Sequence, residues 1–389
     1  MRLAYTPEQQ AFADQMRDYF ASIVTPEVEE EMARGEMGGP HCLEAVRQMG
    51  RDNWLAVSWP EEYGGRQLSL AEQFIFFEEA HGAGAPVPFL TVNTVGQTLL
   101  QFGTDEQKER LLPGILAGET HFCIGYTEPN SGTDLASLQT RAVRDGDEWV
   151  IDGQKIYTSL AGYADYVWLA ARTDPDVPKH KGITIFIVPT DTPGFSHQPL
   201  ITLAGADTTY TFYEGVRVPD SAIVGGLNQG WSLIVNQLNY ERVSLAIPAW
   251  AGRIFDRTVA WARDHKLADG GRVIDQEWAQ ILLARCKADI EYLKLLNWKA
   301  ATTEQLNPAL ASGTKVYGTE MYLRVYRALL EVIGQAGYLK RGSPGAVLKG
   351  HLERSSQGTL ILTFGGGTNE VQRDLVAMFG LQMPRAPRK

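Results

Sequence analysis

The chain has 389 residues, too many for a single hydrophobic core, and 44% of them are hydrophobic, so two or three folded domains are expected. Its formal net charge is −10, without a basic cluster, which argues against nucleic acid and anionic membranes as partners. No apolar run reaches the ~18 residues that a membrane span needs.

The first residues, MRLAYTPEQQAF, lack the basic and then apolar pattern of a secretion signal, so a cytoplasmic protein is expected. The cysteines are Cys42, Cys123 and Cys286, with neither paired spacing nor nearby histidine ligands. They are interpreted as reduced structural thiols, and no disulfide or metal site is expected.

Apolar residues recur at helical spacing in the first part of the chain, from residue 6 to 116. Thr6 is a plausible N-cap, Pro7 suits the first helical position, and Phe12, Met16 and Phe20 share one stripe. Further helices are predicted over 42–49, 70–82 and 105–117, with a turn-rich connection at 59–65.

Strand periodicity replaces helical periodicity from about residue 121. The expected strands lie within 121–127, 140–145, 148–159, 165–173, 182–190 and 209–218, and Asp-Gly, Pro-Gly and similar turns separate them. They predict a β-barrel or sandwich. Helical periodicity returns from Gly226 in segments long enough for an antiparallel bundle. The expected domains are therefore 1–118, helical; 119–225, a β-barrel; and 226–389, a helical bundle.

The segment YTEPNSGTD, residues 126–134, stands out within the strand region. Pro129 stiffens it, and the small residues after Pro129 make a turn that lets backbone amides approach an anionic or carbonyl-rich ligand. Thr127 and Thr133 add hydroxyls. Taken alone, the segment also fits a polar hairpin loop with an Asx turn.

A second segment, GQKIYTS at 153–159, follows at the spacing of a barrel strand. Together the two resemble the signatures of the acyl-CoA dehydrogenase family, a Tyr/Val-Thr-Glu-Pro-x-x-Gly-Ser-Asp loop and a Gly-x-Lys-x-Trp-Ile-Thr strand. The resemblance covers nearly the whole chain. It implies an α+β fold with an N-terminal helical domain, a middle β-barrel and a C-terminal four-helix bundle, and FAD as cofactor.

The resemblance also implies roles for individual residues around the FAD. Tyr126 and Thr127 would bind the pyrimidine edge of the flavin, and Gly132 and Thr133 would lie against the ring and pyrophosphate, with Thr133 also reaching the substrate. The other implied FAD contacts are Tyr157, Ser159, Thr368 and Glu370. Tyr157 stands where Trp is usual and Ser159 where Thr is usual, and Tyr157 could instead be an ordinary barrel aromatic.

Family members remove a proton α to a thioester while a hydride leaves the β carbon for the flavin, so they need a base, which a carboxylate in an apolar cleft supplies. Many carry it in a Tyr-Glu-Gly-Thr segment. The corresponding segment here, TFGGGTNEVQR at 363–373, has Gly366 at that position, which cannot take a proton. In relatives the amide at the Gly366 position donates to the thioester oxygen, which Gly366 can still do. The three glycines could equally end a helix.

The family's second base position is a Glu-Arg pair on a C-terminal helix, found here in VNQLNYERVSLAIP, 235–248. We expect Ile234, Val235, Leu238 and Leu245 to form an apolar stripe that carries Glu241 on the buried face. A buried ion pair with Arg242 or another helix is the alternative. As the base, Glu241 would act with Arg242, which positions it or the thioester, and with Asn239 near the CoA arm.

The half-site that the family draws from a neighbouring subunit looks altered. The segment ARDHKLADGGRVID, 262–275, lacks the usual Phe-Gly, and Glu331 in EVIGQAGY replaces a glutamine that faces the cofactor. A carboxylate near a pyrophosphate is unfavourable. The chain is in this respect similar to the catalytic subunit of two-chain acyl-CoA dehydrogenases of steroid side-chain degradation.

We therefore expect α,β-desaturation of a bulky acyl-CoA, with electrons passing to an electron-transfer flavoprotein. The expected assembly is a heterotetramer with a second acyl-CoA dehydrogenase-like chain, and a homotetramer is the alternative. Two other functions stay open: a non-catalytic partner subunit, and a flavin oxidase or monooxygenase on the same fold.

Overall fold

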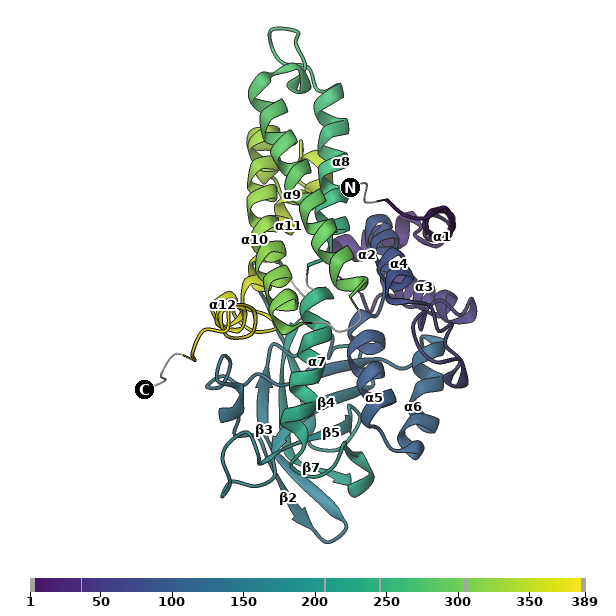
Figure 1. Ribbon diagram of the computed structural model, residues 1–389, viewed down its shortest axis with the longest axis vertical. Helices are drawn as coiled ribbons and strands as arrows, with labels where there is room; N and C mark the ends of the chain where they lie inside the picture. The colour runs from purple at the N-terminus through teal and green to yellow at the C-terminus, as the bar shows by residue number, and fades with distance from the viewer. Residues whose placement is uncertain (1–3, 36, 206–207, 245, 304–306, 386–389) are drawn as a thin grey trace. The chain divides into compact units, whose positions relative to one another are not determined.

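The structure is a computed structural model that describes residues 4–35, 37–205, 208–244, 246–303 and 307–385, without the side chains of 239–244 (Figure 1). The contacts divide the chain into two compact units. The helical unit comprises Met1–Thr25, Ser69–Ala85 and Arg242–Lys389. The sheet unit comprises Pro26–Leu68 and Pro86–Glu241.

The helical unit is built around three long helices that lie side by side in Figure 1, namely α8 (Pro248–Asp264), α9 (Glu277–Ala301) and α10 (Pro308–Ile333). Its other α-helices are α1 (Pro7–Ile23), α4 (Leu70–Ala83), α11 (His351–Gly358) and α12 (Asn369–Leu375). The core between the long helices includes Met321, Tyr322 and Leu329, all of them fully buried. Burial of these side chains holds the bundle together.

The first helix forms as its sequence predicts. The backbone amide of Gln9 donates to the hydroxyl of Thr6 over 3.2 Å, and the side chain of Gln9 accepts from the amide of Thr6 over 3.0 Å. This capping box satisfies two amides that the first turn leaves unpaired. Met16 and Phe20 on this helix are fully buried, whereas Phe12 is half-buried.

The sheet unit contains the shorter helices α2 (Pro26–Arg34), α3 (Pro40–Arg51), α5 (Gln97–Phe102) and α6 (Asp105–Ala117), and a π-helical turn over Leu90–Gly96. Helix α7 (Gly230–Ser244) begins in this unit and runs past its end at Glu241. The predicted helices over 42–49 and 105–117 correspond to α3 and α6.

Eight strands pair in one sheet among the residues that the structure describes, in the order β6-β7-β3-β2-β4-β5-β8, with β1 beside β4. Their bounds are β1 Phe122–Gly125, β2 Arg141–Asp145, β3 Glu148–Ile156, β4 Tyr166–Arg172, β5 Ile183–Pro189, β6 Phe195–Leu200, β7 Thr208–Pro219 and β8 Ile223–Val224. Residues 167–171 of β4 are fully buried, so β4 is the centre of the core.

The pairing of β1 with β4 fixes where the chain leaves the sheet after β1. The two strands run parallel, with Phe122 opposite Tyr166 and Gly125 opposite Leu169. The loop that begins at Tyr126 therefore leaves the sheet beside its most buried strand.

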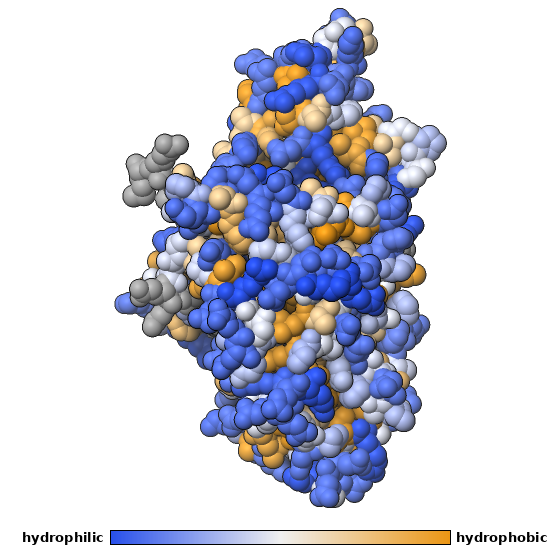
Figure 2. Space-filling view, turned by 90° about the vertical axis from the view of Figure 1, so that its right-hand side faces the viewer, coloured by the Kyte–Doolittle hydropathy of each residue, from blue (hydrophilic) through white to orange (hydrophobic). Residues whose placement is uncertain are grey.

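Among the described residues, no helix is both long and apolar enough to cross a membrane. The face in Figure 2 is largely hydrophilic, with apolar residues in separate patches.

Candidate active site

The loop after β1 is a tight, internally bonded turn. The backbone groups of Glu128 and Ser131 bond to each other in both directions, over 3.0 and 3.1 Å. The hydroxyl of Ser131 also donates to the backbone oxygen of Asp134 over 2.8 Å. With Pro129 restricting the backbone at the tip, the loop has little conformational freedom to lose when it binds a ligand.

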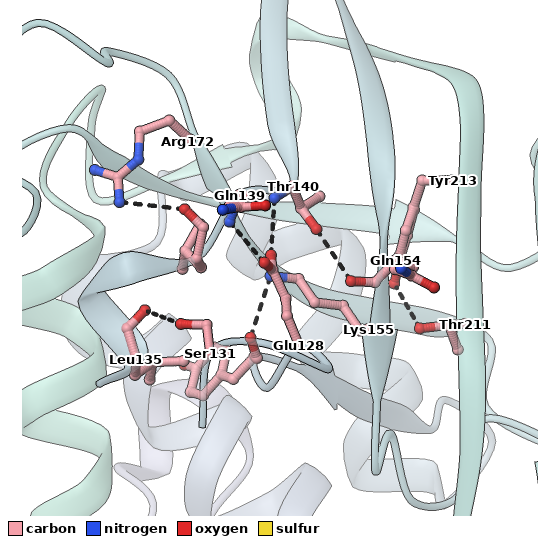
Figure 3. A network of polar contacts seen from close by, with 12 residues as sticks. Glu128, Ser131, Leu135, Gln139, Thr140, Gln154, Lys155, Arg172, Thr211 and Tyr213 are labelled. Carbon is pink, nitrogen blue, oxygen red and sulfur yellow. Dashed lines mark hydrogen bonds and ion pairs between the residues drawn. The ribbon is translucent and has the colours of Figure 1, made fainter. Parts of the chain in front are cut away.

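A buried ion pair fastens this loop to strand β3. The Nζ atom of Lys155 lies 2.8 Å from the carboxylate of Glu128, and it also donates to the backbone oxygen of Tyr126 over 3.1 Å (Figure 3). The same carboxylate accepts from the amides of Gln139 and Thr140, over 2.6 and 2.8 Å. Four hydrogen bonds, from three donor groups in two further segments, therefore converge on the loop.

Burial and charge act against each other in this pair. Burial raises the pKa of Glu128, but the charge of Lys155 and the two amides outweigh it and bring that pKa below its ordinary value. Burial lowers the pKa of Lys155 to about 8, although Glu128 opposes the change. The carboxylate is ionised at neutral pH and shared among its donors, so Glu128 is unsuited to be a base.

The two predicted flavin segments lie next to each other. The amide of Ile156, at the end of β3, donates to the backbone oxygen of Thr127 over 2.9 Å. Tyr157 follows with a φ of 60°, and its side chain is 51% exposed. The hydroxyl of Ser159 donates to that of Thr208 over 3.2 Å. Tyr157 is therefore no core aromatic of this chain, which favours the role that the sequence predicts.

The loop presents open positions to a ligand. Gly132 and Thr133 are exposed, and a Cβ atom built on Gly132 would meet only the methyl group of Thr127, at 3.9 Å. The hydroxyls of Thr127 and Thr133 have no hydrogen-bond partner among the described residues. Free hydroxyls beside an open backbone are what the carbonyl and phosphate oxygens of a flavin nucleotide require.

Tyr126 is predicted to bind the pyrimidine edge of the flavin, but its hydroxyl already makes hydrogen bonds inside the protein. It accepts a hydrogen bond from the indole of Trp168 over 3.0 Å and donates to the side-chain oxygen of Gln237 on α7. Only 8% of Tyr126 is exposed. Because the hydroxyl is already bonded, we expect any contact between Tyr126 and the pyrimidine edge to be made by its backbone.

The buried face of α7 differs from the predicted stripe. Gly230, Leu233, Ile234 and Gln237 are buried, whereas Val235 is 43% exposed. Including Val235 in the stripe was wrong, because it lies about 100° around the helix from Ile234. The corrected face passes through residues 230, 234 and 237 and next reaches Glu241, one turn further on.

The predicted base, Glu241, lies on the part of α7 whose side chains the structure does not describe. The side chains of Asn239, Glu241 and Arg242 lie outside the described residues, as does Leu245 altogether. Gln237 was missed by the sequence interpretation. Its spacing of four residues from Glu241 was the available signal, but an amide is rarely expected on a buried helix face.

The other predicted contact residues of the helical unit follow the 3₁₀ turn Thr359–Thr363, with Gly366 and Thr368 before helix α12 and Glu370 within it. Gly366 and Gly367 have φ values of 65° and 93°, in the left-handed region that favours glycine. The hydroxyl of Thr368 caps α12 by accepting from the amide of Val371 over 3.3 Å. Glu370 is exposed in the first turn of that helix.

A buried lysine holds this glycine segment in place. The Nζ atom of Lys315, on α10, donates over 2.8 Å to the backbone oxygen of Gly367 and over 2.8 Å to the side chain of Asn369. The segment is thus a fixed turn that leads into α12, not only the end of a preceding helix. Glu331, near the end of α10, is exposed.

Comparison with known proteins covers the chain from end to end. Residues 6–119, 123–216 and 228–381 match the N-terminal, middle and C-terminal domains of acyl-CoA dehydrogenases. The acyl-CoA dehydrogenase FadE26 of Mycobacterium tuberculosis is 52% identical over 400 residues, which include 100% of both chains. The acyl-CoA dehydrogenase FadE29 of the same organism is 45% identical over 390 residues, again with 100% of both chains.

Two solved structures share the fold. The ChsE4-ChsE5 complex from Mycobacterium tuberculosis has a chain with a TM-score of 0.93 and 52% identity, over 99% of this chain and 100% of that one. The Tcur3481-Tcur3483 steroid ACAD gives 0.92 and 50%, over 99% and 100%. The predicted fold class is confirmed, with its N-terminal helical, middle sheet and C-terminal helical parts.

Members of the matched family are flavoproteins, and both named relatives are acyl-CoA dehydrogenases with full coverage of the chain. The chain therefore belongs to the acyl-CoA dehydrogenase family and is an oxidoreductase that acts on the CH–CH bond of an acyl-CoA thioester.

Proposed function

We propose that the chain is the FAD-bearing, catalytic subunit of a two-chain acyl-CoA dehydrogenase that acts on bulky, steroid side-chain thioesters. The observation that carries this proposal is the loop of residues 126–134, which Glu128 and Lys155 fasten to β3. At an open glycine it offers two hydroxyls that have no partner among the described residues. A partner subunit without a flavin would not need this construction.

Residues of the loop and of β3 fit the flavin. Thr127 and Thr133 supply hydroxyl donors, the backbone at Gly132 leaves room for a ring or a phosphate, and Tyr157 presents an exposed aromatic face. In the helical unit, Thr368 and Glu370 are the proposed further FAD contacts. When bound, the flavin accepts the hydride that leaves the β carbon of the substrate.

Glu241 is the proposed base. It takes the proton from the α carbon, a step for which a carboxylate needs apolar surroundings that keep it basic. Arg242 and Asn239 are the proposed contacts to the thioester and the CoA arm, and Thr133 is a further substrate contact. The amide of Gly366 donates to the thioester oxygen, where negative charge develops as the proton leaves.

Similarity to the steroid ACAD supports the substrate class. A chain of that complex is 50% identical over nearly the full length, and a chain of the ChsE4-ChsE5 complex is 52% identical. Both structures carry the names of two components, which supports a heterotetramer in which a second acyl-CoA dehydrogenase-like chain completes the FAD site. The exposed Glu331 is an unfavourable neighbour for a pyrophosphate, which is consistent with that arrangement. The proposed electron acceptor of the enzyme is an electron-transfer flavoprotein.

Anaerobic flavin reduction tests this proposal. The co-expressed complex is mixed with a straight-chain acyl-CoA or with a steroid side-chain acyl-CoA, and flavin absorbance is followed by stopped flow. The expected result is rapid bleaching by the steroid thioester, little by the straight chain, and slow reoxidation in air. Faster bleaching by the straight-chain thioester would contradict the substrate class, and rapid reoxidation by oxygen would indicate an oxidase.

A further inference from the structure

A buried lysine lies directly beneath the glycine segment of the helical unit. The side chain of Lys315, on α10, is 0% exposed. Its Nζ atom donates to the backbone oxygen of Gly367 and to the side-chain oxygen of Asn369, over 2.8 Å each. Replacing a buried charge by an apolar side chain of similar size is often neutral or stabilising. The lysine therefore indicates a need for positive charge at this place.

The surroundings of Lys315 suit an ammonium group. Both of the bonded atoms are oxygens that only accept, which favours the charged form of a lysine. The Nδ2 atom of Asn369 donates in turn to the carboxylate of Glu320, over 3.2 Å. That carboxylate is paired with Arg373 at 2.7 Å. Glu320 is therefore shared with a second cation, and it reaches Lys315 only through Asn369.

The carbonyl groups of the glycine segment face buried side chains. The oxygen of Gly367 binds Lys315, and the oxygen of Gly366 accepts from Gln372, which is 0% exposed, over 3.5 Å. The N–H and C=O groups of a trans peptide point in opposite directions, so the amides of Gly367 and Thr368 point away from these side chains. The amides of Gly366 and Gly367 have no hydrogen-bond partner among the described residues. The segment thus offers donors on the side opposite its buried supports.

We propose that Lys315 is a positioning residue for the desaturation, whose charge makes the glycine segment a stronger donor to the thioester oxygen. This inference rests on the proposed role of the Gly366 amide. Lys315 acts through the segment and does not touch the substrate. Its bond to Gly367 holds the turn, and its charge stabilises the negative charge that develops on the thioester oxygen as the α proton leaves.

The effect of Lys315 belongs mainly to the transition state. The thioester oxygen carries little charge in the bound substrate and much more as the enolate forms. An interaction that strengthens in this way raises the rate with little change in binding. A lysine that only stabilised the fold would change unfolding, but would leave the polarisation of a bound thioester as it is. The carbonyl stretching band of that thioester reports the polarisation.

Difference infrared spectroscopy of the co-expressed, oxidised complex measures this band. The ligand is the α,β-unsaturated steroid side-chain product thioester, isotope-labelled at the thioester carbonyl, which the oxidised enzyme binds without reacting. Its band is compared free in water and bound to the wild type, Lys315→Met, Asn369→Asp and Arg324→Met. The rate of anaerobic flavin bleaching by the steroid side-chain acyl-CoA is measured for the same four proteins.

Each variant isolates one feature of the network. Lys315→Met removes the charge and the bond to Gly367. Asn369→Asp keeps the shape and the acceptor, and it places beside Lys315 a carboxylate that the ammonium keeps ionised. Arg324→Met is the matched control. It removes a cation from the same helix, but Arg324 is exposed and pairs with Asp289 at 3.4 Å.

The wild-type band should lie below that of the free product. Lys315→Met should return the band toward the free value and slow bleaching about 10–100-fold, less than the ~10²–10³-fold that loss of an oxyanion donor brings. Product binding should change little. Asn369→Asp should move band and rate in the same direction by less, and Arg324→Met should keep both at their wild-type values.

A Lys315→Met band at the wild-type frequency, with normal flavin content, would overturn the proposal. If Lys315→Met fails to fold, Asn369→Asp decides, since a wild-type band with a carboxylate beside Lys315 would overturn it equally. A wild-type band that does not differ from the free product would mean that no donor reaches the thioester oxygen, and the proposed role of Gly366 would fail first. A displaced wild-type band that neither variant alters would remove only the role of Lys315.

Discussion

The ammonium group of Lys155 and the carboxylate of Glu128, 27 positions apart in the chain, meet at 2.8 Å with their side chains 0% and 7% exposed. They are the third residues of YTEPNSGTD and GQKIYTS, the two segments that form the proposed flavin site. Part of this signature therefore builds the loop and does not touch the ligand. The hydroxyls and the glycine beside the pair are left to do so.

The two partners of this pair should differ in how much their removal destabilises the protein. Glu128→Ala leaves the buried Lys155 without its counter-charge and two amides without their acceptor, so we expect a loss of about 3–5 kcal/mol in the free energy of unfolding. Lys155→Met, which leaves the carboxylate with its two amide donors, should cost less. Urea unfolding followed by tryptophan fluorescence measures both. Equal, small losses near 0.5 kcal/mol would place the pair among weak surface ion pairs.

Two buried groups on α4 should make stability depend on pH in opposite directions. The terminal atoms Oε1 of Glu78 and Nε2 of His81 are buried without hydrogen-bond partners in the described residues, although both side chains reach the surface in part. Burial raises the pKa of Glu78 from 4.5 to about 7. Burial lowers the pKa of His81 from 6.5 to about 4.

The folded state binds the Glu78 proton more tightly than the unfolded state, so stability falls as the pH rises from about 4.5 to 7. Glu78→Gln should remove this loss and gain on the wild type by up to roughly 3 kcal/mol across that window. For His81 the unfolded state binds the proton more tightly, so His81→Leu should gain as the pH falls from about 6.5 to 4. Thermal unfolding against pH measures both, and pH-independent differences would contradict the two assignments.

Two glycines should respond oppositely to alanine. Gly252 lies inside α8 with nothing within 4 Å of a built Cβ atom, so Gly252→Ala should stabilise by about 0.5–1 kcal/mol. Gly366 has a φ of 65°, so Gly366→Ala should destabilise by roughly 1–2 kcal/mol. Thermal unfolding of the two variants provides the comparison. Two shifts of the same sign would show that backbone strain does not decide the outcome at Gly366.

Assembly should depend on a partner chain. Expressed alone, the protein should be flavin-poor or unstable, because Glu331 and the segment 262–275 are unsuited to complete a neighbour's FAD site. Expressed with an acyl-CoA dehydrogenase-like partner, it should form a complex of two copies of each chain with one FAD per copy of this chain. Light scattering and flavin absorbance measure both quantities. A stable, fully FAD-loaded and active homotetramer of this chain alone would contradict the prediction.

Periodicity predicted most of the fold, and the errors have local causes. The predicted helix over 105–117 is α6 with the same ends, since a threonine cap and a glycine stop mark it in the sequence. Strand β6, Phe195–Leu200, was missed because it pairs only with β7 at the sheet edge. Its residues are exposed or half-buried, so FSHQPL carries no apolar alternation.

The candidate site was predicted in part, for a similar reason. Short motifs predict which groups face a ligand, and Thr127, Thr133 and Gly132 are the groups proposed here. They do not show which polar groups pair inside the protein, because such pairing joins positions far apart in the chain. The hydrogen bonds that join Tyr126 to Trp168 and to Gln237 connect positions between 126 and 237, so no local sequence pattern marks them. The exposure of Val235 likewise depends on what covers α7.

Anaerobic bleaching of the flavin in the Glu241→Gln variant tests the account most directly. Glutamine keeps the size of the side chain and cannot accept the proton, so flavin content and acyl-CoA binding should remain. The rate of bleaching by the steroid side-chain acyl-CoA should fall by ~10²–10⁴-fold relative to the wild-type complex. Bleaching by Glu241→Gln at close to the wild-type rate would show that another group removes the proton, and would contradict the proposed active site.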